Sequence, residues 1–139
     1  MNLPLDISSA AQNLAQFLTL SHSKLVTAES CTGGGVAQVL TDISGSSAWF
    51  DRGFITYSNL SKTEMLAVDA SIIEQYGAVS HEVAVLMVAG ALQHSHADYA
   101  IAITGIAGPT GGSKEKPVGT VYIAVQNQQS EAIISLEHF

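Results

Sequence analysis

The sequence predicts an α/β domain built on a mixed sheet, and three observations lead to this fold class. Its 139 residues fit one domain of the usual ~100–200 residues, so we expect residues 1–139 to form a single domain. Segments typical of strands alternate with segments typical of helices, as in layered α/β proteins. The last two strand-like segments are joined only by Asn127–Ser130, which predicts a hairpin and therefore a sheet that is not purely parallel.

Helices are expected where apolar residues recur at helical spacing or where a capping residue precedes them. Asp6 or Ser8 is the expected cap of the first helix. Ser61-Lys62-Thr63-Glu64 matches a capping box, and Asn59 also has the character of a helix start. The expected helices cover residues 3–21, 34–43, about 61–67, 70–76 and 81–94.

Strands are expected where β-branched, aromatic or continuously apolar residues lie between turn signals. The segment 99–104 is an almost unbroken apolar run, which is typical of a strand buried on both faces. The expected strands cover residues 24–28, 49–57, 99–104, 120–126 and 132–136.

Composition excludes several classes of function. Five lysines and arginines stand against twelve aspartates and glutamates, so the chain cannot build the basic face of a nucleic-acid-binding protein. No apolar run reaches the ~18 residues of a membrane span, and the first residues lack the basic region of a signal peptide. One cysteine, Cys31, rules out an internal disulfide. We expect no nucleic-acid partner, no membrane contact and a cytoplasmic location.

A glycine-rich loop, Glu29-Ser30-Cys31-Thr32-Gly33-Gly34-Gly35, follows the first expected strand. A serine at such a turn is expected to be exposed near the positive end of a helix, where glycines let N–H groups converge on a phosphate or an oxyanion. The alternative interpretation is a capped helix start whose glycines permit close packing. Glu29 either orients a group near Ser30 or accepts N–H bonds.

A second loop follows the strand at 99–104, and its candidate binding residues are Thr104, Gly105, Gly108, Thr110 and Gly111. The alternative is a flexible surface loop, and Lys114-Glu115-Lys116 is expected to be its solvated tip. Ligands of open α/β sheets bind beyond the carboxyl ends of strands, so the two loops should meet at one edge.

A serine needs a base before it can act as a nucleophile. The histidines lie away from the strand ends, and their expected roles are structural. Lys62 lies in the first turn of a helix, against the helix dipole, and partial desolvation there would lower its pKa as a general base requires. The alternative for Lys62 is an ordinary surface lysine. Tyr57 lies nearby in sequence and is expected either to relay a proton or to pack on the core as a strand-end residue. Arg52 either holds a phosphate or, more in keeping with mid-strand, pairs near Asp51.

Metal-ligand motifs such as HExxH, CxxC or a paired carboxylate cluster do not occur in the sequence, so we expect neither a metal nor a cofactor.

Five blocks resemble the C-terminal domain of the CinA, competence/damage-inducible family in order and spacing, over residues 8–125. They are Ala28-Glu29-Ser30-Cys31-Thr32-Gly33-Gly34, Tyr57-Ser58-Asn59 with Lys62, Gly77-Ala78-Val79-Ser80, Thr104-Gly105-Ile106-Ala107-Gly108-Pro109 and Lys116-Pro117-Val118-Gly119-Thr120-Val121-Tyr122.

The resemblance implies a three-layer α/β/α fold and hydrolysis of the carboxamide of nicotinamide mononucleotide, without a metal, in pyridine-nucleotide recycling. It implies Ser30 as nucleophile, Lys62 as base and Tyr57 as a helper, with the two loops binding the oxyanion, ribose and phosphate. It also implies a homodimer. Family members usually continue into a closing basic helix, which is absent from this sequence. The alternative is a non-catalytic nucleotide-binding or regulatory module of a competence or DNA-damage response.

Overall fold

The computed structural model describes residues 6–139, and its helices and strands alternate as the sequence predicts. In chain order the elements are α1 (Ile7–Leu20), β1 (Leu25–Glu29), α2 (Gly35–Thr41), a 3₁₀ turn (Ser46–Ala48), β2 (Phe50–Ile55), α3 (Asn59–Leu66), α4 (Ala70–Tyr76), α5 (His81–Gln93), β3 (Tyr99–Gly105), β4 (Thr120–Asn127) and β5 (Ile133–His138).

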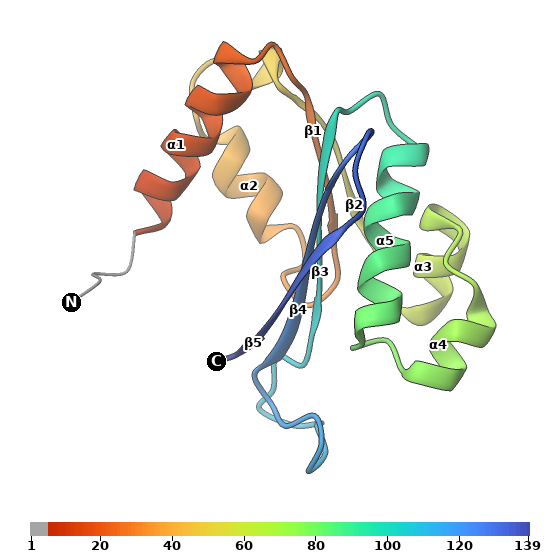
Figure 1. The fold of residues 1–139 in the computed structure, drawn as a ribbon. Coiled ribbons are helices and arrows are strands. Elements are labelled where there is room, and N and C mark those ends of the chain that lie inside the picture. Colours follow the sequence, from red (N-terminus) through yellow and green to blue (C-terminus); the bar gives the residue numbers. More distant parts are fainter. Residues whose placement is uncertain (1–5) are drawn as a thin grey trace.

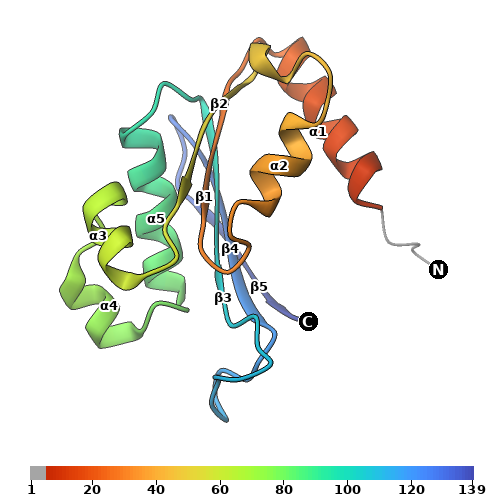
Figure 2. The same ribbon diagram turned by 180° about the vertical axis from the view of Figure 1, so that it is seen from behind.

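The five strands form one sheet in the order β2-β1-β3-β4-β5. β1 pairs in parallel with β2 and β3, whereas β4 runs antiparallel to β3 and β5 antiparallel to β4. Helices α1 and α2 lie on one face of the sheet, and α3, α4 and α5 lie on the other (Figures 1 and 2). The expected mixed sheet and three-layer α/β/α architecture are therefore confirmed.

β1 is an interior strand of the sheet, between β2 and β3, and all five of its residues are buried. Side chains alternate between the faces of a strand. Leu25 packs into the core beneath α1 and α2, while Val26 and Ala28 pack into the core beneath α3, α4 and α5. Two consequences follow for the end of the strand: Glu29 points toward α2, and Ser30 continues toward the side of α3.

Helix α3 begins at Asn59, one of the two expected starts, and therefore before the expected range of about 61–67. Its N-cap is Ser58, whose hydroxyl accepts a hydrogen bond from the Ser61 N–H at 3.1 Å, so the capping box at Ser61 is wrong. β2 ends at Ile55, so the chain turns into the helix within a few residues and Ser58 is already in place as its cap. Lys62 therefore lies one turn into the helix.

Helix α1 has Asp6 as its cap, as one of the two expected alternatives proposes. The expected start at residue 3 lies outside the described residues. Between residues 6 and 139, no helix is both long and apolar enough to cross a bilayer.

Candidate active site

The carboxyl end of β1 brings Ser30 into contact with Lys62 of α3. The Lys62 Nζ atom lies 3.1 Å from the Ser30 Oγ atom, although 32 residues separate the two in sequence. Ser30 is 7% exposed and Lys62 is 1% exposed. The expected exposure of Ser30 is wrong, because the start of α3 and the segment around Ala78 close over the end of the strand.

Two backbone carbonyls hold the amine of Lys62 in this position. Nζ donates to the Thr56 oxygen at 2.8 Å and to the Tyr57 oxygen at 3.3 Å. A carbonyl oxygen can only accept, so a neutral amine spends both of its N–H groups on these two bonds. Its remaining lone pair then faces the Ser30 hydroxyl, which is the arrangement that a general base requires.

Burial favours that neutral form of Lys62. Desolvation lowers the pKa of its ammonium below the ordinary value of 10.5. No carboxylate offsets the cost, because the ion pair between Arg52 and Asp51 is the only one formed by the described residues. The site thus contains a buried lysine whose proton is weakly held.

A cavity of about 170 Å³ opens onto the two side chains. Tyr57 stands at this cavity and is 69% exposed, and its hydroxyl makes no hydrogen bond to any residue from 6 to 139. The residues lining the cavity are Ser30, Cys31, Tyr57, Asn59, Lys62, Ala78, Val79, Thr104, Gly105 and Ala107. The two loops therefore meet at the carboxyl edge of the sheet, as the sequence predicts.

Glu29 fixes the loop that carries Ser30. Its carboxylate accepts hydrogen bonds from the N–H groups of Val36 and Ala37, both at 2.9 Å, at the start of α2. Such bonds satisfy donors that a helix start leaves open. Of the two roles considered for Glu29, accepting N–H bonds is the one the structure shows.

Within that loop, the free backbone donors agree only in part with those expected. The Gly33 N–H donates to the Ser30 oxygen and the Gly35 N–H to the Thr32 oxygen, so these glycines do not direct their N–H groups at an anion. The N–H groups of Cys31, Thr32 and Gly34 donate to no backbone oxygen in the described chain. Those of Cys31 and Thr32 directly follow Ser30, close to where the oxygen of a carbonyl group attacked by its hydroxyl would lie.

Cys31 also lines the cavity, although it is not among the functional residues that the sequence predicts; its place beside Ser30 is the signal that points to it. Its thiol is half-buried, and burial raises the thiol pKa. The hydrogen bond of Lys62 goes to the hydroxyl of the neighbouring Ser30.

The other candidate binding residues are divided among three places. Thr104 and Gly105 line the cavity, and the Thr104 hydroxyl donates to the Ala78 oxygen at 2.8 Å. Thr32 and Gly35 instead line an apolar groove between α1 and α2. Neither set of lining residues includes Gly33, Gly34, Gly108, Thr110 and Gly111.

The tip of the second loop is not fully solvated, contrary to expectation. Lys114 is exposed, but Lys116 is half-buried and its Nζ atom donates to the Tyr76 oxygen at 2.9 Å. The side chain therefore lies against the carboxyl end of α4, where the helix dipole favours a cation.

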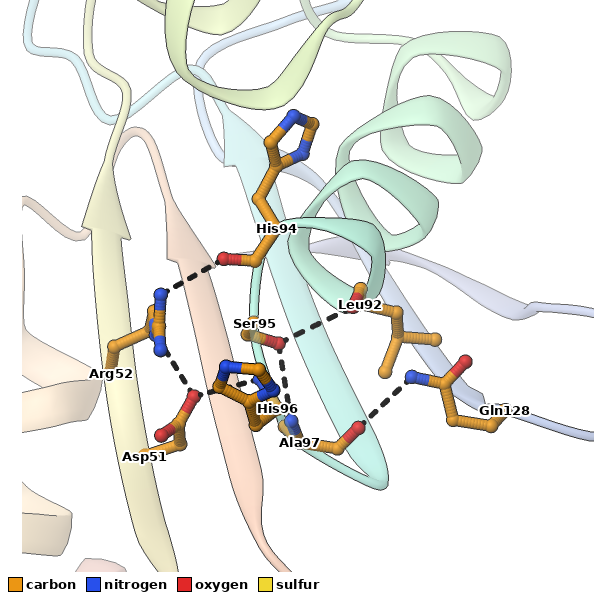
Figure 3. Close-up of polar contacts among 8 residues, drawn as sticks. All are labelled: Asp51, Arg52, Leu92, His94, Ser95, His96, Ala97 and Gln128. Atoms are coloured by element: carbon orange, nitrogen blue, oxygen red, sulfur yellow. Dashed lines mark hydrogen bonds and ion pairs between the residues drawn. The ribbon is translucent and has the colours of Figure 1, made fainter.

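Arg52 and two of the histidines hold the opposite end of the sheet together (Figure 3). Arg52 pairs with Asp51 at 2.9 Å and donates to the His94 oxygen at 3.1 Å. The His96 N–H donates to the same Asp51 carboxylate, and His94 Nδ1 lies 2.8 Å from the Gly90 oxygen. Structural roles for these residues are therefore confirmed.

Comparison with known proteins gives a consistent result. Residues 7–139 match the family described as the CinA C-terminal domain. The nicotinamide-nucleotide amidohydrolase PncC of Escherichia coli (strain K12) is 51% identical over 134 residues, which cover 96% of this chain and 81% of that protein. The enzyme of the same name from Pseudomonas putida is 50% identical over 118 residues, covering 85% of this chain and 74% of that one.

Solved structures share the architecture as well. A competence/damage inducible protein from Agrobacterium tumefaciens superposes with a TM-score of 0.94 at 45% identity, covering 100% of this chain and 85% of that one. A CinA superfamily protein from Escherichia coli gives 0.93 at 35% identity, covering 100% and 81%.

Proposed function

The chain belongs to the CinA C-terminal domain family, and from this membership we propose that it acts as its relatives are named, as a nicotinamide-nucleotide amidohydrolase. The substrate is nicotinamide mononucleotide, the bond broken is the carboxamide C–N bond, and the products are nicotinic acid mononucleotide and ammonia. Nicotinic acid mononucleotide then re-enters pyridine-nucleotide recycling. The names of relatives that are 50–51% identical support this reaction.

One observation carries the mechanism: a buried, unpaired amine lies 3.1 Å from a serine hydroxyl beside a cavity. In the first step, Ser30 Oγ attacks the carboxamide carbon while neutral Lys62 takes the hydroxyl proton. The N–H groups of Cys31 and Thr32 donate to the resulting oxyanion. A single donor of this kind contributes about 2.7–4 kcal/mol in well-studied hydrolases.

The tetrahedral intermediate then collapses. Lys62 returns its proton to the departing nitrogen, ammonia leaves, and a nicotinoyl ester remains on Ser30. Lys62 is neutral again and removes a proton from a water molecule that attacks the ester carbon. The C–O bond to Ser30 breaks, the serine recovers its proton through Lys62, and the acid product leaves and loses its remaining proton to solvent as the carboxylate.

Tyr57 has a supporting role in this scheme. Its exposed ring stands at the cavity, and we assign it to covering the pyridine ring of the substrate. The Thr104 hydroxyl holds the Ala78 carbonyl and so fixes the cavity wall from the second loop.

The central test is the release of ammonia from nicotinamide mononucleotide by purified variants. Ser30→Ala removes the nucleophile, and we expect the rate to fall by at least about 10⁴-fold, as in other serine hydrolases. The hydroxyl is small and lies in a pocket, so the melting temperature should stay close to that of the wild-type protein.

Cys31→Ala is the discriminating variant, because it removes the neighbouring nucleophilic atom and leaves the backbone N–H in place. We expect it to keep its rate within about threefold, since the thiol pKa is raised and Lys62 bonds to the serine instead. An inactive Cys31→Ala beside an active Ser30→Ala would exchange the two roles and refute the mechanism.

A further inference from the structure

Cations are scarce in this molecule, and their positions restrict where an anion can bind. The chain has five lysines and arginines and a net charge of −7. Lys24 precedes β1, and Arg52 is paired with Asp51, so neither is near the carboxyl ends of the parallel strands. Lys62 is inside the cavity wall. Only Lys114 and Lys116 remain, in the loop between β3 and β4 that projects beyond this edge (Figures 1 and 2).

Lys116 is held in place, whereas Lys114 is not. A tight turn fixes the backbone of Lys116, because the Ser113 N–H donates to the Lys116 oxygen at 2.8 Å and the Lys116 N–H donates to the Ser113 hydroxyl at 3.0 Å. Its side chain then reaches across to the Tyr76 oxygen at 2.9 Å. No carboxylate pairs with it among the described residues. Two of its three N–H donors therefore remain available.

The amine of Lys116 lies just behind the cavity wall. A Cβ atom added to Gly77 would be 3.5 Å from Lys116 Nζ, and Gly77 is followed directly by the lining residues Ala78 and Val79. Two residues span at most about 7 Å, so the ammonium lies within one side-chain length of the cavity rim. The hydrogen bond from Thr104 to Ala78 fixes the segment that lies between the ammonium and the cavity.

The cavity is too small for a whole nucleotide. Its volume of about 170 Å³ is below the roughly 300–1,000 Å³ of pockets that enclose drug-sized ligands. It has room for the carboxamide ring at Ser30, and the ribose and phosphate must then extend past the rim. On the rim formed by Tyr57 and Asn59 no cation is present in residues 6–139. Behind the part of the wall formed by Ala78 and Val79, the amine of Lys116 lies next to Gly77.

We propose that Lys116 binds the phosphomonoester group of the substrate and so selects a nucleotide over the free pyridine amide. This inference rests on the proposed amidohydrolase function and adds a specificity-determining residue to it. The ammonium donates to phosphate oxygens beyond the rim while it keeps its bond to the Tyr76 carbonyl. It also supplies local attraction for an anion in a protein whose overall charge repels one.

The test compares Lys116→Ala with Lys114→Ala, which removes the same charge from the same loop. A hydrogen bond to a charged group corresponds to about a ten- to hundredfold change in binding. We expect Lys116→Ala to raise KM for nicotinamide mononucleotide by that factor with kcat within about twofold, and Lys114→Ala to change KM by less than about twofold. Ribose 5-phosphate should act as a competitive inhibitor. Its inhibition constant should rise by the same factor as KM in Lys116→Ala, and it should not rise in Lys114→Ala.

Lys116→Arg keeps the cation and should restore most of the affinity, which separates charge from loop structure. Equal effects of the two alanine variants, an unchanged inhibition constant for ribose 5-phosphate in Lys116→Ala, or a fall in kcat without a rise in KM would overturn the assignment. If the wild-type protein releases no ammonia from nicotinamide mononucleotide, the proposed function itself fails. If the wild type is active and Lys116→Ala behaves like it, only the phosphate site fails.

Discussion

The proposed chemistry of this site depends on the environment of the Lys62 side chain. It is a buried cationic residue with no carboxylate partner, and three oxygen atoms surround its amine within 3.3 Å. Burial of a lysine without a counter-charge costs free energy unless the proton leaves. The protein therefore stabilises the neutral amine at pH values where a surface lysine is charged.

The pH dependence of kcat/KM should report this property. Only neutral Lys62 accepts the serine proton, and desolvation lowers its pKa below 10.5. We therefore expect kcat/KM to rise with pH through the lowered pKa and then to level off, which can be measured by ammonia release across a pH series.

Two variants of Lys62 complete this prediction. Lys62→Met removes the base, and general-base catalysis is typically worth about 10²–10⁴-fold, so the rate should fall by that amount and the rising limb should vanish. Lys62→Arg stays protonated at every pH of the series and should be equally slow. A rising limb that persists in Lys62→Met would assign the titration to another group.

At the scale of single residues, the sequence predicts the pair but not its surroundings. A serine at the end of a strand and a lysine early in the next helix are recognisable as candidates, and the contact between them agrees with that prediction. The burial of Ser30 and the inward reach of Lys116 depend on Ala78 and Tyr76, which are distant in sequence. No local pattern carries that information.

The packing of α5 against α3 determines where Lys62 lies. Gly90 of α5 faces the carboxyl end of α3, and a Cβ atom added there would overlap the carbonyl group of Leu66. The two helices approach closely because this position has no side chain. Since α3 carries Lys62, the contact also positions the base.

Gly90→Ala should therefore destabilise the fold and weaken catalysis together. Overpacking of this kind typically costs about 1–3 kcal/mol, so the melting temperature should fall by several degrees. A displaced α3 would also lengthen the contact between Lys62 and Ser30 and reduce kcat. Thermal unfolding and ammonia release measure the two effects.

Gly35→Ala in α2 is the matched control for this change. A Cβ atom there meets no other atom within 4 Å, and the residue is helical, so the same substitution should leave the melting temperature unchanged or raise it. If Gly90→Ala is as stable as Gly35→Ala, the close approach of α3 and α5 does not exist in solution.

At the scale of elements, periodicity predicts the helices and strands, and their ends are less well predicted. The apolar run of β3 and the hairpin between β4 and β5 follow directly from the sequence. Ser58 and Ser61 are equally good caps by residue type, and only the short turn from β2 decides between them. Glu29 could not be assigned in advance, because its partners belong to the helix that it caps.

The proposed mechanism uses an amine and backbone donors and needs no metal ion. Among residues 6–139 no three histidine, cysteine, aspartate or glutamate side chains gather into a site for a metal ion. We expect ammonia release to keep its rate within experimental error after treatment with a chelator, measured against an untreated sample. A loss that returns on adding a divalent cation would contradict the proposed mechanism.

The order of the strands is the part of the architecture that the sequence leaves open. Alternating helices and strands predict the layers, and the final hairpin predicts an antiparallel edge. That β1 lies between β2 and β3 follows from pairings between segments far apart in the chain. This interior place puts the end of β1 beside the end of β3, where both loops converge.

The two carbonyls that hold Lys62 belong to the main chain at Thr56 and Tyr57. The Tyr57 side chain is exposed, so replacing it leaves its carbonyl oxygen where it is. The alignment of the amine is thus independent of the side chain at this position, so an evolving lineage can change the residue at the mouth of the pocket, and with it the ligands admitted, without moving Lys62.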